Sequence, residues 1–314
     1  MNMKRILSLA LTAVMVWTLA VPVGVSAQAS PLQQLTELEK QLYGRPVEEG
    51  SIIERLGRLE NDLFGRTERG ALLVRLERLR SYVDATGING NSLTVKLTAL
   101  EWMMYQSVNS DKPLFDRIKE LELGIFGSTN TGPVENRVQE LTNIVWGGRD
   151  IATAVREVPS STLVKIQLLA GVSSEKNKVN DQIPYEIIED IIVDGTLVIP
   201  AGTKGTATVT EAREAGRLGR DGVLRLDFGR VTAIDGSRIR LVLSERASEE
   251  NQSLYMAAGA SMLGVVLLAG NPIGLAGALL VKGKDVSIDS NVEFYVEVAT
   301  EAKVNGLVVS LGQN

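Results

Sequence analysis

Residues 55–65 read RLGRLENDLFG, and residues 117–127 repeat their pattern as RIKELELGIFG. Counted from the leucine or isoleucine at the second position, apolar residues stand at offsets 0, +3 and +7, an aromatic residue at +8 and glycine at +9. Such offsets place the apolar side chains on one face of an α-helix, and the glycine suits the end of that helix. Six copies at spacings of 20 or 21 residues are anchored on Leu35, Leu56, Leu76, Leu97, Ile118 and Val138.

The repeat predicts an array of short α-helices over residues 28–150. A helix of about 14 residues is too short to be stable alone, so each must bury its apolar face against others. Two arrangements meet this need: a stack of helices joined by loops, and a coiled-coil stalk or oligomeric bundle, since 21 residues make three heptads. Gly65, Gly127 and the Arg45-Pro46 step interrupt the heptads and favour the stack. Beside the apolar stripe, a cation stands at offset −1 in five copies, as Arg55, Arg75, Lys96, Arg117 and Arg137.

The composition excludes most of the common catalytic chemistries. The 314 residues include no histidine and no cysteine, which excludes nucleophilic triads, the usual zinc sites, thiol redox chemistry and disulfides. A net charge of −5 lacks the positive excess of a nucleic-acid-binding protein. No catalytic, cofactor-binding or metal-binding residue follows from the sequence, and the protein is expected not to be an enzyme.

The first 27 residues have the pattern of a secretory signal peptide. Lys4 and Arg5 precede the apolar run 6–21, and small residues at Val25 and Ala27 fit a signal-peptidase site before Gln28. An uncleaved membrane anchor is the alternative, because about 20 apolar residues can span a bilayer. Either way the chain is expected to be exported, to the periplasm or the outer membrane.

After residue 150 the periodicity changes to that of β-strands, which predicts a β domain over residues 151–304 and a tail at 305–314. The turns Asp194-Gly195, Asp221-Gly222 and Asp235-Gly236 are strong hairpin signals. Many short strands with such turns are typical of an antiparallel sandwich or barrel, so the whole chain is expected to be an α+β multidomain protein. The β-branched runs are 162–170, 183–193, 196–199, 204–211, 223–234 and 238–244.

Four segments of this β domain resemble a small domain of the bacterial envelope. They read VPSST at 158–162, VDGTLVIPAGT at 193–203, GRLG at 216–219 and VTAIDG at 231–236. They are similar to the C-terminal β-barrel of the outer-membrane channel subunit of conjugative, type IV secretion systems, whose Ile-Pro-x-Gly-Thr/Ser step stands here at 199–203. The resemblance implies a β-barrel fold, and in that subunit a helical hairpin crosses the outer membrane where this chain carries residues 254–281.

Residues 254–281 form an apolar insertion rich in glycine. Asn271-Pro272 divides it into two arms, and glycines at close spacing let helices approach one another in membranes, as in a glycine zipper. The segment is therefore expected to be a helical hairpin. It either enters a membrane or oligomerises, or else packs as a soluble hairpin on the β domain. The residues expected to mediate membrane contact or oligomerisation are Gly259, Gly264, Gly270, Gly274 and Gly277.

Other side chains are weaker candidates for interaction. Trp102 stands at offset +5, off the apolar stripe, where it is placed to contact a glycan or a protein partner. Arginines in one hairpin loop are candidates for contact with anionic lipid or cell-wall polymer; they are Arg213, Arg217 and Arg220. A carboxylate pair for catalysis would come from Glu186, Glu189, Asp190 and Asp194, although their alternation in a strand is more typical of a solvated face.

These observations predict an exported, non-catalytic protein of the cell envelope. The helical repeats act as a spacer or interaction arm, and the β domain docks to a membrane or oligomerises. One alternative is an oligomeric secretion or channel component of the outer membrane. A second is an enzyme that acts on cell-wall polymer through carboxylates, with the repeats as a binding arm. The expected partners are envelope proteins, a membrane or cell-wall polymer, and further copies of the chain.

Overall fold

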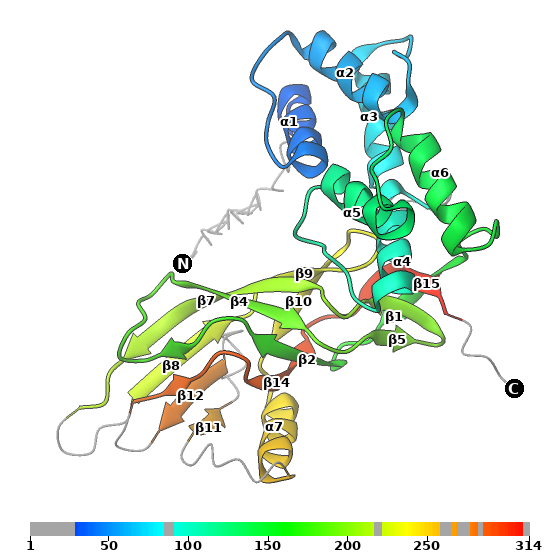
Figure 1. Ribbon diagram of the computed structural model, residues 1–314. Helices are drawn as coiled ribbons and strands as arrows, with labels where there is room; N and C mark the ends of the chain where they lie inside the picture. Colours follow the sequence, from blue (N-terminus) through cyan, green and yellow to red (C-terminus); the bar gives the residue numbers. More distant parts are fainter. Residues whose placement is uncertain are drawn as a thin grey trace, which may run out of the picture.

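The computed structural model describes residues 29–84, 91–216, 222–257, 265–268, 277–281 and 285–309. Six helices come first along these residues, and antiparallel sheets follow them (Figure 1). This α+β layout is the one predicted from the change in periodicity after residue 150. The expected signal peptide at 1–27 lies outside the described residues.

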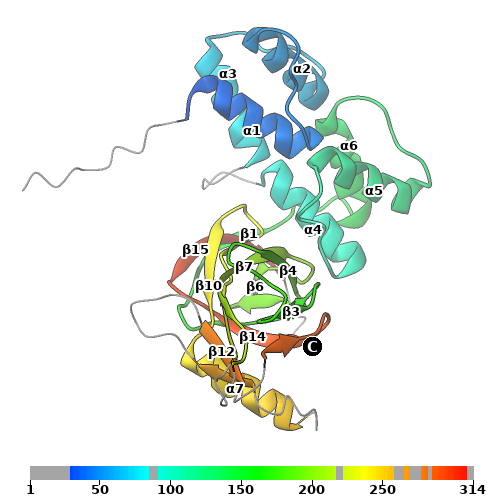
Figure 2. The same cartoon turned by 90° about the vertical axis from the view of Figure 1, so that its left-hand side faces the viewer.

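The helices of the N-terminal half are 12 or 13 residues long. Helices α1 to α3 lie further from the sheets than α4, which lies against them (Figures 1 and 2). The array therefore extends away from the β domain at one end and is attached to it at the other. The bounds are α1 Pro31–Tyr43, α2 Ile52–Phe64, α3 Leu72–Val83, α4 Leu93–Tyr105, α5 Leu114–Phe126 and α6 Val134–Val145.

Local chemistry sets the ends of these helices. Ser30 and Ser51 begin α1 and α2 with capping boxes, in which the serine hydroxyl accepts the backbone N–H three residues on. Gly44, Gly65 and Gly127 end α1, α2 and α5 in the left-handed region, at φ of 78°, 72° and 71°. Glycine at offset +9 thus ends the helix in these copies, since it adopts this conformation without steric cost.

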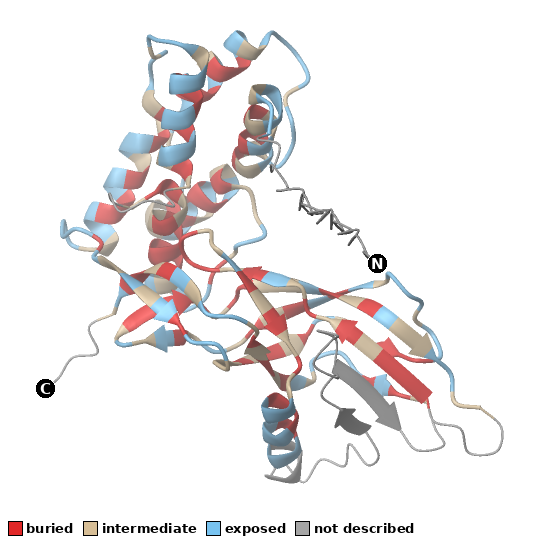
Figure 3. Ribbon diagram, turned by 180° about the vertical axis from the view of Figure 1, so that it is seen from behind, coloured by how far each residue is buried: buried red, intermediate tan, exposed pale blue. Residues whose placement is uncertain are grey.

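The apolar stripes of the six helices meet in one core within the single chain. The residues at offsets 0 and +3 are all buried there, and Figure 3 shows buried residues along the inner sides of the helices. Helices four places apart also meet: the rings of Tyr43 and Phe115 lie edge to face at 4.9 Å. Gly44 and Gly65 leave room for the rings of Pro113 and Pro133, because a Cβ at either glycine would lie 2.6 Å from a proline Cγ.

A buried ion pair links neighbouring helices. The arginine at offset −1 donates to a glutamate at offset +4 of the preceding helix, with pairs Arg55–Glu39, Arg75–Glu60, Arg117–Glu101 and Arg137–Glu122. The same glutamates accept a backbone N–H from the loop eight residues further on, at Val47, Glu68, Asn109 and Asn130. Each carboxylate therefore fixes both the following helix and the loop that leads to it.

We call this set of arginine, glutamate and loop N–H the clamp. The clamp is missing between α3 and α4. Offset +4 of the third copy is Arg80, which pairs with Glu77 in its own helix at 3.8 Å. The third copy also has Asp84 where the other five have an aromatic residue, and it ends without a left-handed cap. The array is thus made of two clamped groups of three helices, α1 to α3 and α4 to α6.

The β domain contains a four-stranded sheet in the order β1-β15-β6-β5 and a nine-stranded sheet in the order β11-β12-β8-β7-β4-β2-β14-β10-β9. All the pairings between described strands are antiparallel. The strand bounds are β1 Thr153–Val158, β2 Leu163–Leu168, β3 Val172–Ser173, β4 Gln182–Ile187, β5 Ile191–Val193, β6 Thr196–Ile199, β7 Lys204–Arg213, β8 Gly222–Asp227, β9 Arg230–Thr232, β10 Arg238–Val242, β11 Val265–Leu268, β12 Gly277–Val281, β13 Ser287–Ile288, β14 Glu293–Val298 and β15 Ala302–Val308. The expected boundary at 304 is wrong, because Val304 and Leu307 are buried and β15 continues to Val308.

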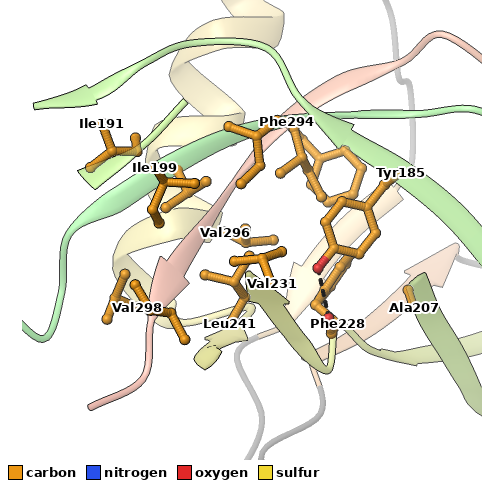
Figure 4. Packing of buried hydrophobic residues seen from close by; sticks show 14 of the residues in the cluster. Tyr185, Ile191, Ile199, Ala207, Phe228, Val231, Leu241, Phe294, Val296 and Val298 are labelled. Atoms are coloured by element: carbon orange, nitrogen blue, oxygen red, sulfur yellow. Dashed lines mark hydrogen bonds between the residues drawn. The ribbon is translucent and has the colours of Figure 1, made fainter. Parts of the chain in front are cut away.

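The strands β13 and β3 form a third, two-stranded sheet. Apolar side chains from the two larger sheets form one core (Figure 4). Tyr185 is buried in it, and its hydroxyl donates to the Phe228 carbonyl at 2.7 Å. Burial raises the pKa of Tyr185, so this hydroxyl keeps its proton and its hydrogen bond. Gly205 lies under the tyrosine ring, where a Cβ would come within 2.3 Å of the ring carbon Cζ. The ring of Phe228 in turn lies edge to face on Phe294 at 5.6 Å.

The expectation of a helical hairpin over 254–281 is wrong for the described part of that segment. Helix α7, Glu245–Ala257, ends near its beginning. The two arms then contain β11 and β12, which pair with each other and extend the nine-stranded sheet beyond β8. Short apolar runs of four or five residues suit strands as well as helices, and the neighbouring edge of β8 offers backbone partners that favour the strand.

We expect Arg117→Ala to lower the free energy of unfolding by about 3–5 kcal/mol, because it leaves the Glu101 carboxylate buried without its cation. The Arg117 side chain is 3% exposed, and its guanidinium donates to both Glu101 oxygens at 2.8 and 2.7 Å. Urea denaturation followed by circular dichroism measures the change.

The matched control is Lys119→Ala, two residues away on the same helix. Lys119 pairs with Asp116 at 3.2 Å, and both side chains are more than half exposed, so its loss should cost less than about 1 kcal/mol. Equal effects of the two variants would contradict a structural role for the buried clamp.

Candidate functional site

The helical array and the β domain meet at the C-terminal end of α4. Trp102 Nε1 donates to Asp190 Oδ2 at 2.7 Å, and the backbone N–H of Ala201 donates to Asp190 Oδ1, also at 2.7 Å. One carboxylate thus joins a helix of the array to the loop after β6. Ala99 of the same helix is buried in the core of the β domain.

The loop after α4 adds further contacts with the same part of the β domain. Val108 N–H donates to the Ala201 carbonyl at 3.1 Å. Gly202, at φ +83°, leaves space for this approach, because a Cβ there would lie 2.6 Å from the Val108 nitrogen. Lys204 pairs with Asp111 at 3.0 Å. The IPAGT segment at 199–203, which carries the sequence resemblance, is therefore the part of the β domain that the loop after α4 contacts.

Trp102 is half-buried and already has a partner within the chain. The prediction of an external partner stays a prediction, but the indole N–H is not available for it. Sequence reasoning missed the Trp102–Asp190 pair because 88 residues separate the two and no periodic pattern connects them.

The four carboxylates considered for catalysis have separate surroundings. Asp190 accepts the hydrogen bonds at the junction between α4 and the loop after β6, and Glu189 pairs with Lys165 at 3.0 Å. Asp194 has a φ of 46° in the two-residue turn between β5 and β6, as its Asp-Gly sequence predicted. Glu186 lies in β4, opposite Gln167 and Lys204 on the neighbouring strands. Within the part of the chain that the structure describes, no acidic cluster suits a metal ion.

A hollow of 1060 Å³ lies on one side of the junction, between the array and the turn that joins β9 and β10. Hydroxyl and charged side chains line it, among them Thr94, Thr98, Arg80 and Arg238. Asp235 in its wall accepts backbone N–H groups of Ser237 and Asn305 at 2.9 and 2.8 Å. That carboxylate therefore holds the turn in place.

The β11–β12 hairpin occupies one edge of the nine-stranded sheet. All nine residues of the two strands are apolar, as VVLL and GALLV. The hairpin therefore adds a wholly apolar stretch of sequence to that edge of the sheet. Helix α7 lies beside β11 and β14 (Figure 1).

The structure places one of the five predicted glycines in this hairpin. Gly277 begins β12, whereas Gly259, Gly264, Gly270 and Gly274 lie outside the described residues. Among the residues with a described structure, no helix combines the length and the apolar character that a bilayer crossing requires.

The three candidate arginines are only partly placed. Arg213 ends β7, opposite Val223 of β8, and its guanidinium lies 4.0 Å from the Glu211 carboxylate. Arg217 and Arg220 lie outside the described residues. The cationic loop thus stays a prediction.

Comparisons with known protein families and with curated proteins find no match. Among solved structures, a similar chain is ComB10 of the Com type IV secretion system of Helicobacter pylori. The two share 15% sequence identity at a TM-score of 0.21, over 45% of this chain and 90% of that chain. The likeness is distant, so the functional argument rests on the residues of this chain.

We expect Asp190→Ala to loosen the junction, because it leaves the Trp102 and Ala201 N–H groups without an acceptor. Unpaired buried donors cost about 1–3 kcal/mol each. Limited proteolysis should then release the array at residues 106–113 several times faster than in the intact chain. Glu189→Ala is the control, since the Glu189 side chain is 54% exposed. Equal cleavage rates in all three proteins would show that Asp190 does not hold the junction.

Proposed function

We propose that the chain is an exported, non-catalytic protein of the cell envelope whose β domain assembles at, or docks to, a membrane. The helical array serves as a spacer or interaction arm. The β11–β12 hairpin provides the contact with lipid or with further copies of the chain. The signal-peptide pattern of residues 1–27 supports export.

The observation that carries the proposal is the apolar hairpin at one edge of the nine-stranded sheet, as the described residues place it. Strand β11 pairs with β12 on one side and is the last strand of its sheet. No described strand pairs with its other side, and the backbone N–H and C=O groups of an edge strand favour pairing with another chain. A hairpin made wholly of apolar residues gains free energy when lipid or a second apolar surface covers it.

The attachment of the array supports the role of a spacer. Helices α1 to α3 lie on the far side of α4 from the sheets (Figure 2). Helix α4 contributes side chains to the cores of both the array and the β domain. This packing and the hydrogen bonds at Asp190 and Ala201 fix the direction of the array relative to the β domain. A partner held by the array would thus lie at a set distance from whatever the hairpin contacts.

The non-catalytic part of the proposal rests on composition and on the separate engagement of the carboxylates. Histidine and cysteine are missing from the whole sequence. Asp190 and Glu189 have structural partners, and the two do not form a pair with each other.

An oligomeric secretion or channel component is the alternative function. It differs from a docking protein in one property, namely the formation of closed rings by the purified protein.

The test places a charge on each strand of the hairpin. Val266 of β11 is the register partner of Leu280 of β12. We expect the double variant Val266→Asp, Leu280→Asp to reduce the membrane-bound or assembled fraction several-fold, because two carboxylates must then be desolvated for contact. Cell fractionation and sedimentation velocity measure the two fractions.

Val179→Asp is the matched control, because Val179 is an exposed valine of the β domain outside the hairpin. It should leave the distribution unchanged, and circular dichroism should show that both variants keep their β structure. An intact protein that is wholly soluble and monomeric would refute the proposal, as would a double variant that distributes like the intact chain.

A further inference from the structure

A second hollow lies on the other side of the junction, where the array meets the first and last strands of the β domain. Its volume is 440 Å³, within the range of small-ligand sites. The side chains that line it and matter for binding are Trp102, Met103, Trp146, Arg149, Asp150 and Val308.

The two indoles come together from different copies of the repeat. The chain has three tryptophans, of which Trp17 lies in the predicted signal peptide and the other two both line this hollow. Trp102 stands at offset +5 of the fourth copy, and Trp146 at offset +8 of the sixth. Two large aromatic side chains on one small hollow supply a large apolar contact surface for a ligand.

Both indoles are held in place without a ligand. The hydrogen bond to Asp190 at 2.7 Å fixes the edge of the Trp102 ring. Trp102 and Trp146 both pack against the core of the β domain. Little conformational entropy is therefore lost when a ligand settles on them, which favours binding.

Charged groups of both signs stand beside the indoles. Arg149 and Asp150 are exposed, and neither belongs to an ion pair among the described residues. Arg149 Nε donates to the Trp146 carbonyl at 3.3 Å, which leaves its two terminal nitrogens free to donate elsewhere. The hollow thus offers apolar faces, several N–H donors and a carboxylate acceptor.

We propose that this hollow binds a sugar ring of an oligosaccharide chain. A pyranose has apolar C–H faces and a rim of hydroxyls that both donate and accept. The indoles suit the faces, the guanidinium suits hydroxyl lone pairs, and the carboxylate suits hydroxyl protons. A wholly apolar ligand would leave Arg149 and Asp150 without hydrogen bonds, and an anion without hydroxyls would leave the Asp150 carboxylate without a donor.

The proposal goes beyond membrane docking and uses different residues. The hairpin that carries the proposed function lies in β11 and β12, whereas the hollow is formed by α4, the residues after α6 and the end of β15. Failure of sugar binding would leave the hairpin proposal intact, and the reverse also holds.

The two indoles themselves report on binding. In the full chain carrying Trp17→Phe, every remaining tryptophan lines the hollow. We expect the indole fluorescence to change saturably on titration with at least one of three tetrasaccharides: chitotetraose, cellotetraose or maltotetraose. Trp146→Ala and Asp150→Asn should each weaken that binding at least tenfold.

Ile144→Ala provides the matched control, because Ile144 is an exposed apolar residue of α6 outside the lining. Its affinity should equal that of the parent. Arg149→Gln replaces the guanidinium at an exposed position without disturbing the core, so weaker binding by this variant would show that the guanidinium contacts the sugar. The proposal is overturned if none of the three sugars gives a saturable change, or if Asp150→Asn and Arg149→Gln both bind like the parent.

Discussion

The buried arginine–glutamate clamp is the interaction on which the helical half depends. A carboxylate out of water is costly unless its oxygens accept enough hydrogen bonds. Each clamp glutamate accepts two from an arginine and one from a loop N–H, as Glu101 does from Arg117 and Asn109. The hydrogen bond to Glu39 also raises the pKa of Arg55, so the guanidinium keeps its charge. The clamp therefore determines where each loop turns and where the next helix lies.

The clamp also explains the two repeat lengths. The loop N–H always follows its glutamate by eight residues, whereas the arginine follows by 16 or 15. A one-residue difference is thus absorbed between the loop and the next helix, and the spacings of 21 and 20 preserve the same contacts. Where Arg80 replaces the glutamate, the clamp is lost. Contacts between helices four places apart, such as Gly44 with Pro113, join the two groups of three.

Periodic features were predictable from the sequence, and single long-range contacts were not. The apolar stripe at repeat offsets 0 and +3 predicted the helices, and the glycine at offset +9 predicted where they end. Both features depend on residues that are close together in the chain. The arginine at −1 was visible, but its glutamate was missed, although Glu39, Glu60, Glu101 and Glu122 recur at +4. The pairing of Trp102 with Asp190 had no such signal. The apolar insertion was assigned to helices because its glycines suit helix packing, whereas the free edge of β8 favours strands.

Helix α4 shows how the spacer becomes part of the domain that it carries. Leu97 and Leu100 belong to the core of the array, and Ala99 belongs to the core of the β domain. Trp102 lies on the same side as the β domain, and its ring packs on that core. A helix between two cores must be apolar on more than one side, which explains why the fourth copy, LTVKLTALEWMMY, is the least amphipathic of the six. The departure of one copy from a repeat pattern therefore marks the helix at which a repeat array joins another domain.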